Sequence, residues 1–147
     1  MRLAYAFLAE AAETIRGRFY VFGGGIEEIK CDDLPVVMMS LAVVAKIQVE
    51  GDEVSAVHTF KLTSEAPDGT PFIPELTKPL GPVAESDRSG RPVYHLTVVN
   101  AKGMLIRSYG PHFVTISIND EVMSRLTFHV LYSEQDQPGQ VTLEQEL

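Results

Sequence analysis

Apolar and polar residues alternate with a period of two along several short segments of the chain. In 112–118, Val114, Ile116 and Ile118 alternate with Thr115 and Ser117. This period places one set of side chains on each face of a β-strand, so one face can be buried. It also predicts strands over 56–63, 94–99 and 126–130. The buried sets expected there are Phe60 and Leu62; Tyr94, Leu96 and Val98; and Leu126, Phe128 and Val130.

Pairs of glycine, proline, asparagine and aspartate interrupt the chain at short intervals, and such pairs mark turns. The segments between them have the length that is typical of strands in a sandwich or barrel. Asn119–Asp120–Glu121 joins two of the alternating segments and predicts a hairpin. We therefore predict a single antiparallel β-sandwich of seven to nine strands, Ig-like in general plan.

The longest apolar run extends from Leu34 to Ala45. A helix needs about twenty apolar residues to cross a bilayer, and this run of twelve is too short. It predicts a buried strand that continues to Val49.

Two regions give no single clear prediction of secondary structure. Among the first twenty residues, alternation favours a strand over 2–9, whereas alanine and glutamate favour a helical turn or short helix over Glu10–Ile15. A second strand is expected over Arg18–Phe22. Residues 66–92 contain six prolines and predict a long irregular connection, with a short edge strand over Leu80–Val83.

The chain has 147 residues, 45% of them hydrophobic, and a formal net charge of −8. This length fits one domain that can form its own core. Residues 133–147 hold four of the twenty acids and no lysine or arginine, so residues 1–132 carry sixteen acids against twelve bases. We predict a domain over 1–132 and an acidic, mobile tail over 133–147. The acid excess disfavours nucleic acid as a partner, and without a signal peptide or membrane span we expect a cytoplasmic protein.

Several local features suggest chemistry but have simpler explanations. Gly23–Gly24–Gly25 is followed by Glu27 and Glu28, which would repel phosphate, so it predicts a strand end with a bulge or tight turn. The acids near it lack the spacing of a calcium loop. Cys31 lies beside Asp32 and Asp33, whose charges raise a thiol pKa and argue against a nucleophile.

The histidines are the remaining candidates for a site. They show no H-x-H or H-E-x-x-H spacing, so the sequence assigns no metal, cofactor or catalytic residue. His58 and His112 share the parity of apolar residues and lie near strand starts, where a ring can be half buried at one end of a sandwich. They are the two pocket candidates.

Four motifs support a family resemblance. They are the Phe22-Gly-Gly-Gly25 turn, Pro35 before a long apolar strand, His58-Thr-Phe-Lys-Leu leading to Pro67-Asp-Gly69, and the hairpin from Gly110 to Asp120. The chain resembles a family of small uncharacterised bacterial proteins, a domain of unknown function of about this length. Their last hairpin usually reads Gly-x-Tyr-x-Phe-x-Ile-x-Val-Asp-Gly, whereas this chain has His112, Val114 and Asn119–Asp120 at the corresponding places. The resemblance implies a fold and no activity.

The absence of catalytic motifs favours a non-enzymatic binding or assembly module. A protein partner or a second copy would dock on an exposed edge strand or sheet face. The alternative is a small-ligand or metal-binding protein, or an enzyme, with a pocket at one end of the sandwich lined by His58 or His112 and nearby acids.

Overall fold

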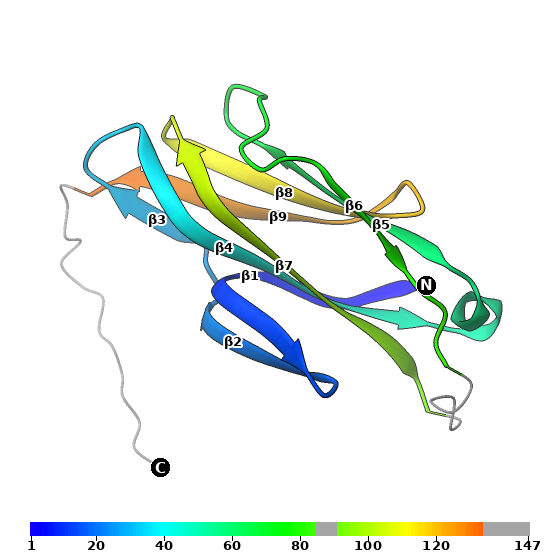
Figure 1. The fold of residues 1–147 in the computed structure, drawn as a ribbon. Coiled ribbons are helices and arrows are strands. Elements are labelled where there is room, and N and C mark those ends of the chain that lie inside the picture. Colours follow the sequence, from blue (N-terminus) through cyan, green and yellow to red (C-terminus); the bar gives the residue numbers. More distant parts are fainter. Residues whose placement is uncertain (85–90, 134–147) are drawn as a thin grey trace, which may run out of the picture.

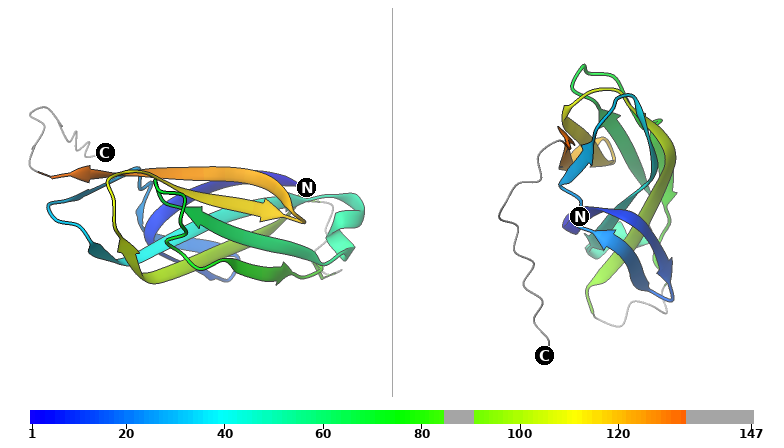
Figure 2. Two further views of the ribbon diagram at one scale, coloured as in Figure 1. Left: turned by 90° about the horizontal axis from the view of Figure 1, so that it is seen from above. Right: turned by 90° about the vertical axis from the view of Figure 1, so that its left-hand side faces the viewer.

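The computed structural model describes residues 1–84 and 91–133, which form two β-sheets and one short 3₁₀ helix (Figure 1). The sheets have four and five strands and form two layers (Figure 2). The all-β sandwich is confirmed, with nine strands, while the Ig-like plan stays a prediction. The tail predicted over 133–147 lies outside the described residues from 134 onward. No helix within the two described ranges is long and apolar enough to span a membrane.

The four-stranded sheet has the order β2-β1-β4-β7, and all its neighbouring strands are antiparallel. Its strands are β1 (Arg2–Ile15), β2 (Arg18–Gly24), β4 (Val36–Val49) and β7 (Val93–Ile106). β4 is an inner strand, and it is apolar on both faces. Leu41 and Val43 pack into the main core, while Ala42 and Val44 join a second, smaller cluster. The predicted buried strand is therefore confirmed, and its continuous apolar run reflects burial on both faces.

The five-stranded sheet has the order β3-β9-β8-β5-β6. Its strands are β3 (Glu28–Cys31), β5 (His58–Glu65), β6 (Leu76–Leu80), β8 (Gly110–Ile118) and β9 (Glu121–Tyr132). β3 is parallel to β9, and the other pairs are antiparallel. The predicted hairpin is confirmed as β8–β9. Asn119 and Asp120 form its turn with φ values of 50° and 64°, a left-handed conformation that these two residue types tolerate.

The main core lies between the two sheets. The alternating residues of the five-stranded sheet fill it from one side: Phe60 and Leu62 of β5, Val114 and Ile116 of β8, and Phe128 and Val130 of β9 are fully buried. Burial of each such side chain contributes about 1.5–3 kcal/mol. The period-two pattern therefore identifies the inner face of these three strands correctly.

The short helix predicted over Glu10–Ile15 is wrong, because β1 continues as a strand through Ile15 and bends sharply part-way along (Figure 1). Beyond the bend, β1 pairs with β2, where Ala12 lies opposite Val21 and Thr14 opposite Phe19. Pairing and burial of this hairpin against the second cluster outweigh the local helix propensity of alanine and glutamate.

Two further expectations need correction. In β7 the faces are reversed: Thr97 is 2% exposed and lies opposite Ala45 of the main core, whereas Val98 packs into the second cluster. Both faces of this sheet carry apolar residues, so alternation alone does not tell which face is internal. The edge strand expected over Leu80–Val83 lies earlier, at Leu76–Leu80.

Candidate functional site

The two histidines predicted to line a pocket lie at opposite ends of the five-stranded sheet. His58 begins β5 and His112 is near the start of β8. These strands are antiparallel, with Phe60 opposite Ile118 and Glu65 opposite Phe113, so their starts are far apart. The structure therefore gives each histidine its own surroundings, and no single site contains both.

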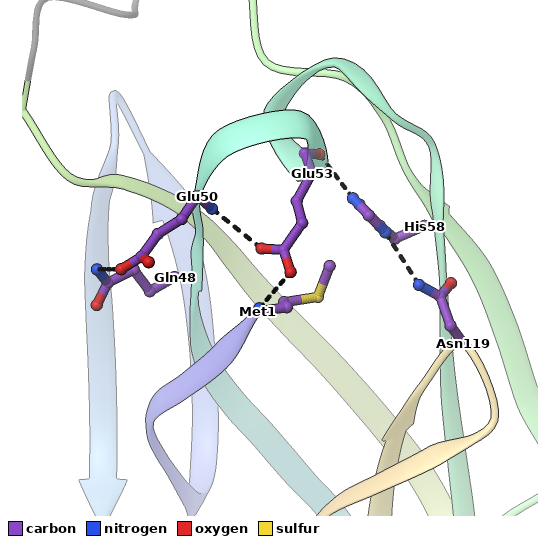
Figure 3. A network of polar contacts seen from close by, with 6 residues as sticks. All are labelled: Met1, Gln48, Glu50, Glu53, His58 and Asn119. Atoms are coloured by element: carbon purple, nitrogen blue, oxygen red, sulfur yellow. Dashed lines mark hydrogen bonds and ion pairs between the residues drawn. The ribbon is translucent and has the colours of Figure 1, made fainter.

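His58 is part of a hydrogen-bonded network beside the 3₁₀ helix Gly51–Ser55 (Figure 3). Its Nε2 donates to the backbone carbonyl of Glu53 at 2.7 Å, and its Nδ1 accepts from Nδ2 of Asn119 at 3.0 Å. Asn119 Oδ1 in turn accepts from the backbone N–H of Thr59 at 2.9 Å. Both ring nitrogens are engaged, so His58 fixes the β8–β9 turn to the start of β5.

Glu53 extends this network to the first strand. Its carboxylate forms an ion pair with the amino group of Met1 and accepts from the backbone N–H of Glu50 at 3.0 Å. These contacts hold the pKa of Glu53 below its usual value, with the bond from Met1 as the largest cause. The His58 end of the sandwich is therefore an internally satisfied structural junction.

His112 has a different environment. Its ring is fully buried, stacks on Phe128 with centroids 5.2 Å apart, and meets Phe72 edge-on at the same centroid distance. Nδ1 donates to the carbonyl of Gly110 at 3.1 Å, whereas Nε2 has no hydrogen-bond partner in the described part of the chain. Burial lowers the pKa of His112, although the Gly110 bond and the charge of Asp68 oppose this shift. The ring is therefore neutral near pH 7, with a bare lone pair on Nε2.

A cavity of about 270 Å³ adjoins His112 at this end of the sandwich. Its lining residues come from the β5–β6 loop, the β7–β8 connection and the ends of the adjoining strands. Its lining residues are Ala66, Asp68, Thr70, Pro71, Phe72, Leu105, Arg107, Ser108 and His112. One acid, one base, two hydroxyls and several apolar groups thus face one small volume.

Asp68 is held in place within this cavity. Its Oδ1 accepts from the backbone N–H of Thr70 at 3.0 Å and from the Thr70 hydroxyl at 2.6 Å. These bonds are the main cause of the lowered pKa of Asp68, and the charge of Arg107 adds a smaller effect. Arg107 therefore lies close enough to Asp68 for its charge to act on the carboxylate. The ion pairs of the described residues nevertheless include none between Asp68 and Arg107.

A second candidate surface is β2, which lies at one end of the four-stranded sheet, so that one of its edges is free of any other strand within residues 1–84 and 91–133. Phe22 is 72% exposed and Tyr20 is 51% exposed, and they alternate along the strand with Phe19 and Val21. Phe19 turns toward the sheet and packs against Tyr5, with ring centroids 6.3 Å apart. The exposed side of β2 is thus an aromatic strip beside backbone groups that pair with no other strand in the described part of the chain.

The remaining motifs have structural explanations. The three glycines close β2, where Gly23 has φ +61° and Gly25 has φ +83°. Cys31 is half-buried, and its pKa is raised first by burial and then by Asp32 and Asp33, in the predicted direction. Nowhere in the described ranges do three histidine, cysteine, aspartate or glutamate side chains gather as metal ligands.

The sequence singles out His112 as a pocket candidate, but it does not indicate that Asp68 and Arg107 line the same cavity. In the sequence, Asp68 is part of the Pro67-Asp-Gly69 motif, and Arg107 follows a strand end. The two lie 39 positions apart, and only the sandwich topology brings their loops together. The strand expected over Arg18–Phe22 is confirmed as β2, but nothing in its sequence indicates that this strand lies at the edge of a sheet.

The sequence was also compared with known proteins. A family model described as a family of unknown function (DUF6941) matches residues 4–131, and the chain belongs to this family. No curated protein matches the chain.

Proposed function

We propose that this member of the DUF6941 family is a non-enzymatic assembly module, in which β2 pairs with β2 of a second copy. The observation that carries the proposal is the free, aromatic edge of β2, with Tyr20 and Phe22 largely exposed. A strand added at such an edge gains main-chain hydrogen bonds and buries alternate side chains. Two four-stranded sheets would then join into one.

The other edge strands carry features that discourage pairing. β3 has only four residues, and β6 contains Lys78 and Pro79. β7 carries Lys102 and has a left-handed residue, Gly103, at φ +66°. Short length, lysine, proline and local distortion are the usual protections of an edge. β2 has no lysine or proline, and its only charged residue is Arg18. Its left-handed residue, Gly23, lies near the end of the strand, outside the stretch 18–22.

The sequence of β2 is complementary to itself in one antiparallel register. With Tyr20 opposite Tyr20 of the second copy, Arg18 lies opposite Phe22 on the exposed face, and Phe19 lies opposite Val21 on the other face. Cross-strand aromatic, apolar and cation–π pairs of this kind are favourable. The chain already uses the same chemistry within its other sheet, where the Arg125 guanidinium lies 3.7 Å from the centroid of the Phe113 ring.

Charge does not oppose this pairing. β2 contains no acid, so the acidic residues of the two copies do not meet at the shared edge. The net charge of −8 is screened over about 8 Å at physiological ionic strength. Because association itself costs at least about 4 kcal/mol, we expect a dimer that dissociates on dilution.

The register is tested by cysteine cross-linking in a Cys31→Ser background. Directly opposed residues of an antiparallel pair have Cα atoms about 4.5–5.5 Å apart, a separation that a disulfide can bridge. We expect Tyr20→Cys to form a covalent dimer under mild oxidation. Thr77→Cys, which places an exposed cysteine on the edge strand β6, is the matched control and should stay monomeric.

Sedimentation of the wild-type chain over a concentration series is the independent measurement. The proposal requires a dimer that Phe22→Lys weakens, because the new lysine would face Arg18 of the second copy. A wild-type chain that stays monomeric at its highest soluble concentration, together with equal cross-linking of Tyr20→Cys and Thr77→Cys, would refute self-assembly through β2.

A further inference from the structure

The cavity beside His112 contains a carboxylate and a guanidinium that do not neutralise each other by direct contact. We propose that this cavity binds a small zwitterion of amino-acid size, with the ligand's ammonium group at Asp68 and its carboxylate at Arg107. The inference is independent of strand pairing by β2, because the cavity is formed by other loops at the end of the sandwich.

Asp68 supplies a fixed negative charge. Both bonds from Thr70 go to Oδ1, which orients the carboxylate and leaves Oδ2 without a donor from any other described residue. Because the pKa of Asp68 is lowered, the group is ionised at neutral pH. An ammonium group can therefore bind at Oδ2 without disturbing the turn that Thr70 stabilises.

Arg107 supplies the complementary positive charge. A guanidinium is always protonated and can hold a carboxylate through two parallel hydrogen bonds. In the described part of the chain, Arg107 forms no ion pair and no hydrogen bond through its side chain. Opposite charges that line one cavity without touching match a ligand that carries both charges itself.

The rest of the cavity limits the size and polarity of the ligand. A volume of about 270 Å³ lies just below the range of about 300–1,000 Å³ that is typical of pockets for drug-sized molecules. Phe72, Leu105 and the ring of His112 contribute an apolar wall. A short aliphatic side chain fits this wall, so an amino acid such as alanine suits the cavity better than a sugar or a nucleotide.

The binding test uses the full chain and three matched probes. L-alanine carries both charges, N-acetyl-L-alanine carries only the carboxylate, and L-alaninamide carries only the ammonium group. Asp68 and Arg107 are both exposed, and an ion pair between exposed groups is weak. We expect titration calorimetry to show that L-alanine binds several-fold more tightly than either of the other two probes, because only L-alanine can form both ion pairs.

Two variants test which residue binds the ammonium group of the ligand and which binds its carboxylate. Asp68→Asn keeps the acceptor oxygen for Thr70 but removes the charge, so it should weaken L-alanine and L-alaninamide and leave N-acetyl-L-alanine unchanged. Arg107→Gln should show the reverse selectivity. Lys30→Gln, which removes an exposed charge on β3, is the control and should leave all three affinities unchanged.

The imidazole ¹⁵N resonances of His112 test whether L-alanine binds in the cavity beside this ring. We expect them to shift on addition of L-alanine, whereas those of His58 stay constant, because His58 lies at the other end of the sheet. The proposal is overturned if no α-amino acid binds at millimolar concentration. It is equally overturned if both charge variants leave the L-alanine affinity unchanged, or if N-acetyl-L-alanine binds as tightly as L-alanine.

Discussion

The side chain of Asn100 in β7 forms hydrogen bonds with both backbone groups of Ala12 in β1, as a paired strand would. Its Nδ2 donates to the Ala12 carbonyl at 2.9 Å, and its Oδ1 accepts from the Ala12 N–H at 3.4 Å. Close by, the Ser40 hydroxyl donates to the carbonyl of Glu10 at 2.7 Å. These bonds satisfy backbone groups at the bend of β1 and hold the β1–β2 hairpin, including the proposed assembly edge, against the sandwich.

Asn100→Ala should therefore lower the free energy of unfolding by about 1–2 kcal/mol, because a largely buried backbone donor and acceptor lose their partners. Urea denaturation followed by far-UV circular dichroism measures this change. Thr77→Ala on β6 is a suitable control, since Thr77 is exposed and its side chain forms no such bridge to another described strand. Equal midpoints for the two variants would mean that Asn100 does not hold the bend.

The β8–β9 hairpin and the bend of β1 show why one part of the fold is predictable from the sequence and another is not. The β8–β9 hairpin is local: its alternation and its Asn119–Asp120 turn lie within one short stretch of chain. The strand character of Glu10–Ile15 depends on Asn100 and on β2, so local propensity gave the wrong answer. Distant contacts of this kind decide the structure wherever the local preference is weak.

The candidate site shows the same division. Parity along 112–118 places His112 on the face of Val114 and Ile116 and predicts a half-buried ring, whereas the ring is in fact fully buried. The identities of Asp68 and Arg107 as its neighbours depend on which loops the topology places at that end of the sandwich. No spacing in the sequence encodes that proximity.

Gly23 and Gly25 provide a matched pair for testing the end of β2. Both have positive φ, so an alanine at either position costs about 1–2 kcal/mol in backbone strain. A Cβ at Gly23 would also lie 2.7 Å from Cγ and Cδ of Glu10, whereas a Cβ at Gly25 meets no atom within 4 Å. Because the exposed Glu10 side chain must move aside, we expect Gly23→Ala to lower the melting temperature slightly more than Gly25→Ala.

The double variant Gly23→Ala with Glu10→Ala separates the two causes. Removing the Glu10 side chain leaves its backbone bond to Ser40 intact, so the double variant should match Gly25→Ala in thermal stability. A double variant as unstable as Gly23→Ala alone would show that backbone strain, and not the contact with Glu10, dominates at Gly23.

His112 should make the stability pH-dependent. Its folded pKa is lowered by burial, whereas its unfolded pKa is about 6.5. Between these two values the unfolded chain binds more protons than the folded one, so the free energy of unfolding rises with pH in that window. The contribution is fully present above about pH 6.5 and is lost as the pH falls below it.

His112→Phe tests this linkage, because phenylalanine preserves the stacking on Phe128 without a titrating group. Denaturant unfolding at a series of pH values should show a smaller loss of stability below pH 6.5 in this variant than in the wild type. His129→Gln, which alters an exposed histidine, should keep the wild-type slope. If His112→Phe also keeps that slope, His112 is not the group responsible.

The junction at the other end of the sandwich can be tested through Asn119 and Asp120, which occupy the two left-handed positions of the β8–β9 turn. Glycine tolerates both positions, so Asn119→Gly and Asp120→Gly change the backbone in similar ways. Of the two, only Asn119 has side-chain hydrogen bonds to other described residues: it donates to Nδ1 of His58 and accepts from the N–H of Thr59. Asn119→Gly should therefore be less stable than Asp120→Gly by about 1–2 kcal/mol. Hydrogen exchange should place the loss at the start of β5, with faster exchange of the Thr59 amide. Equal stability and equal Thr59 exchange in the two variants would show that the His58 network does not secure this turn.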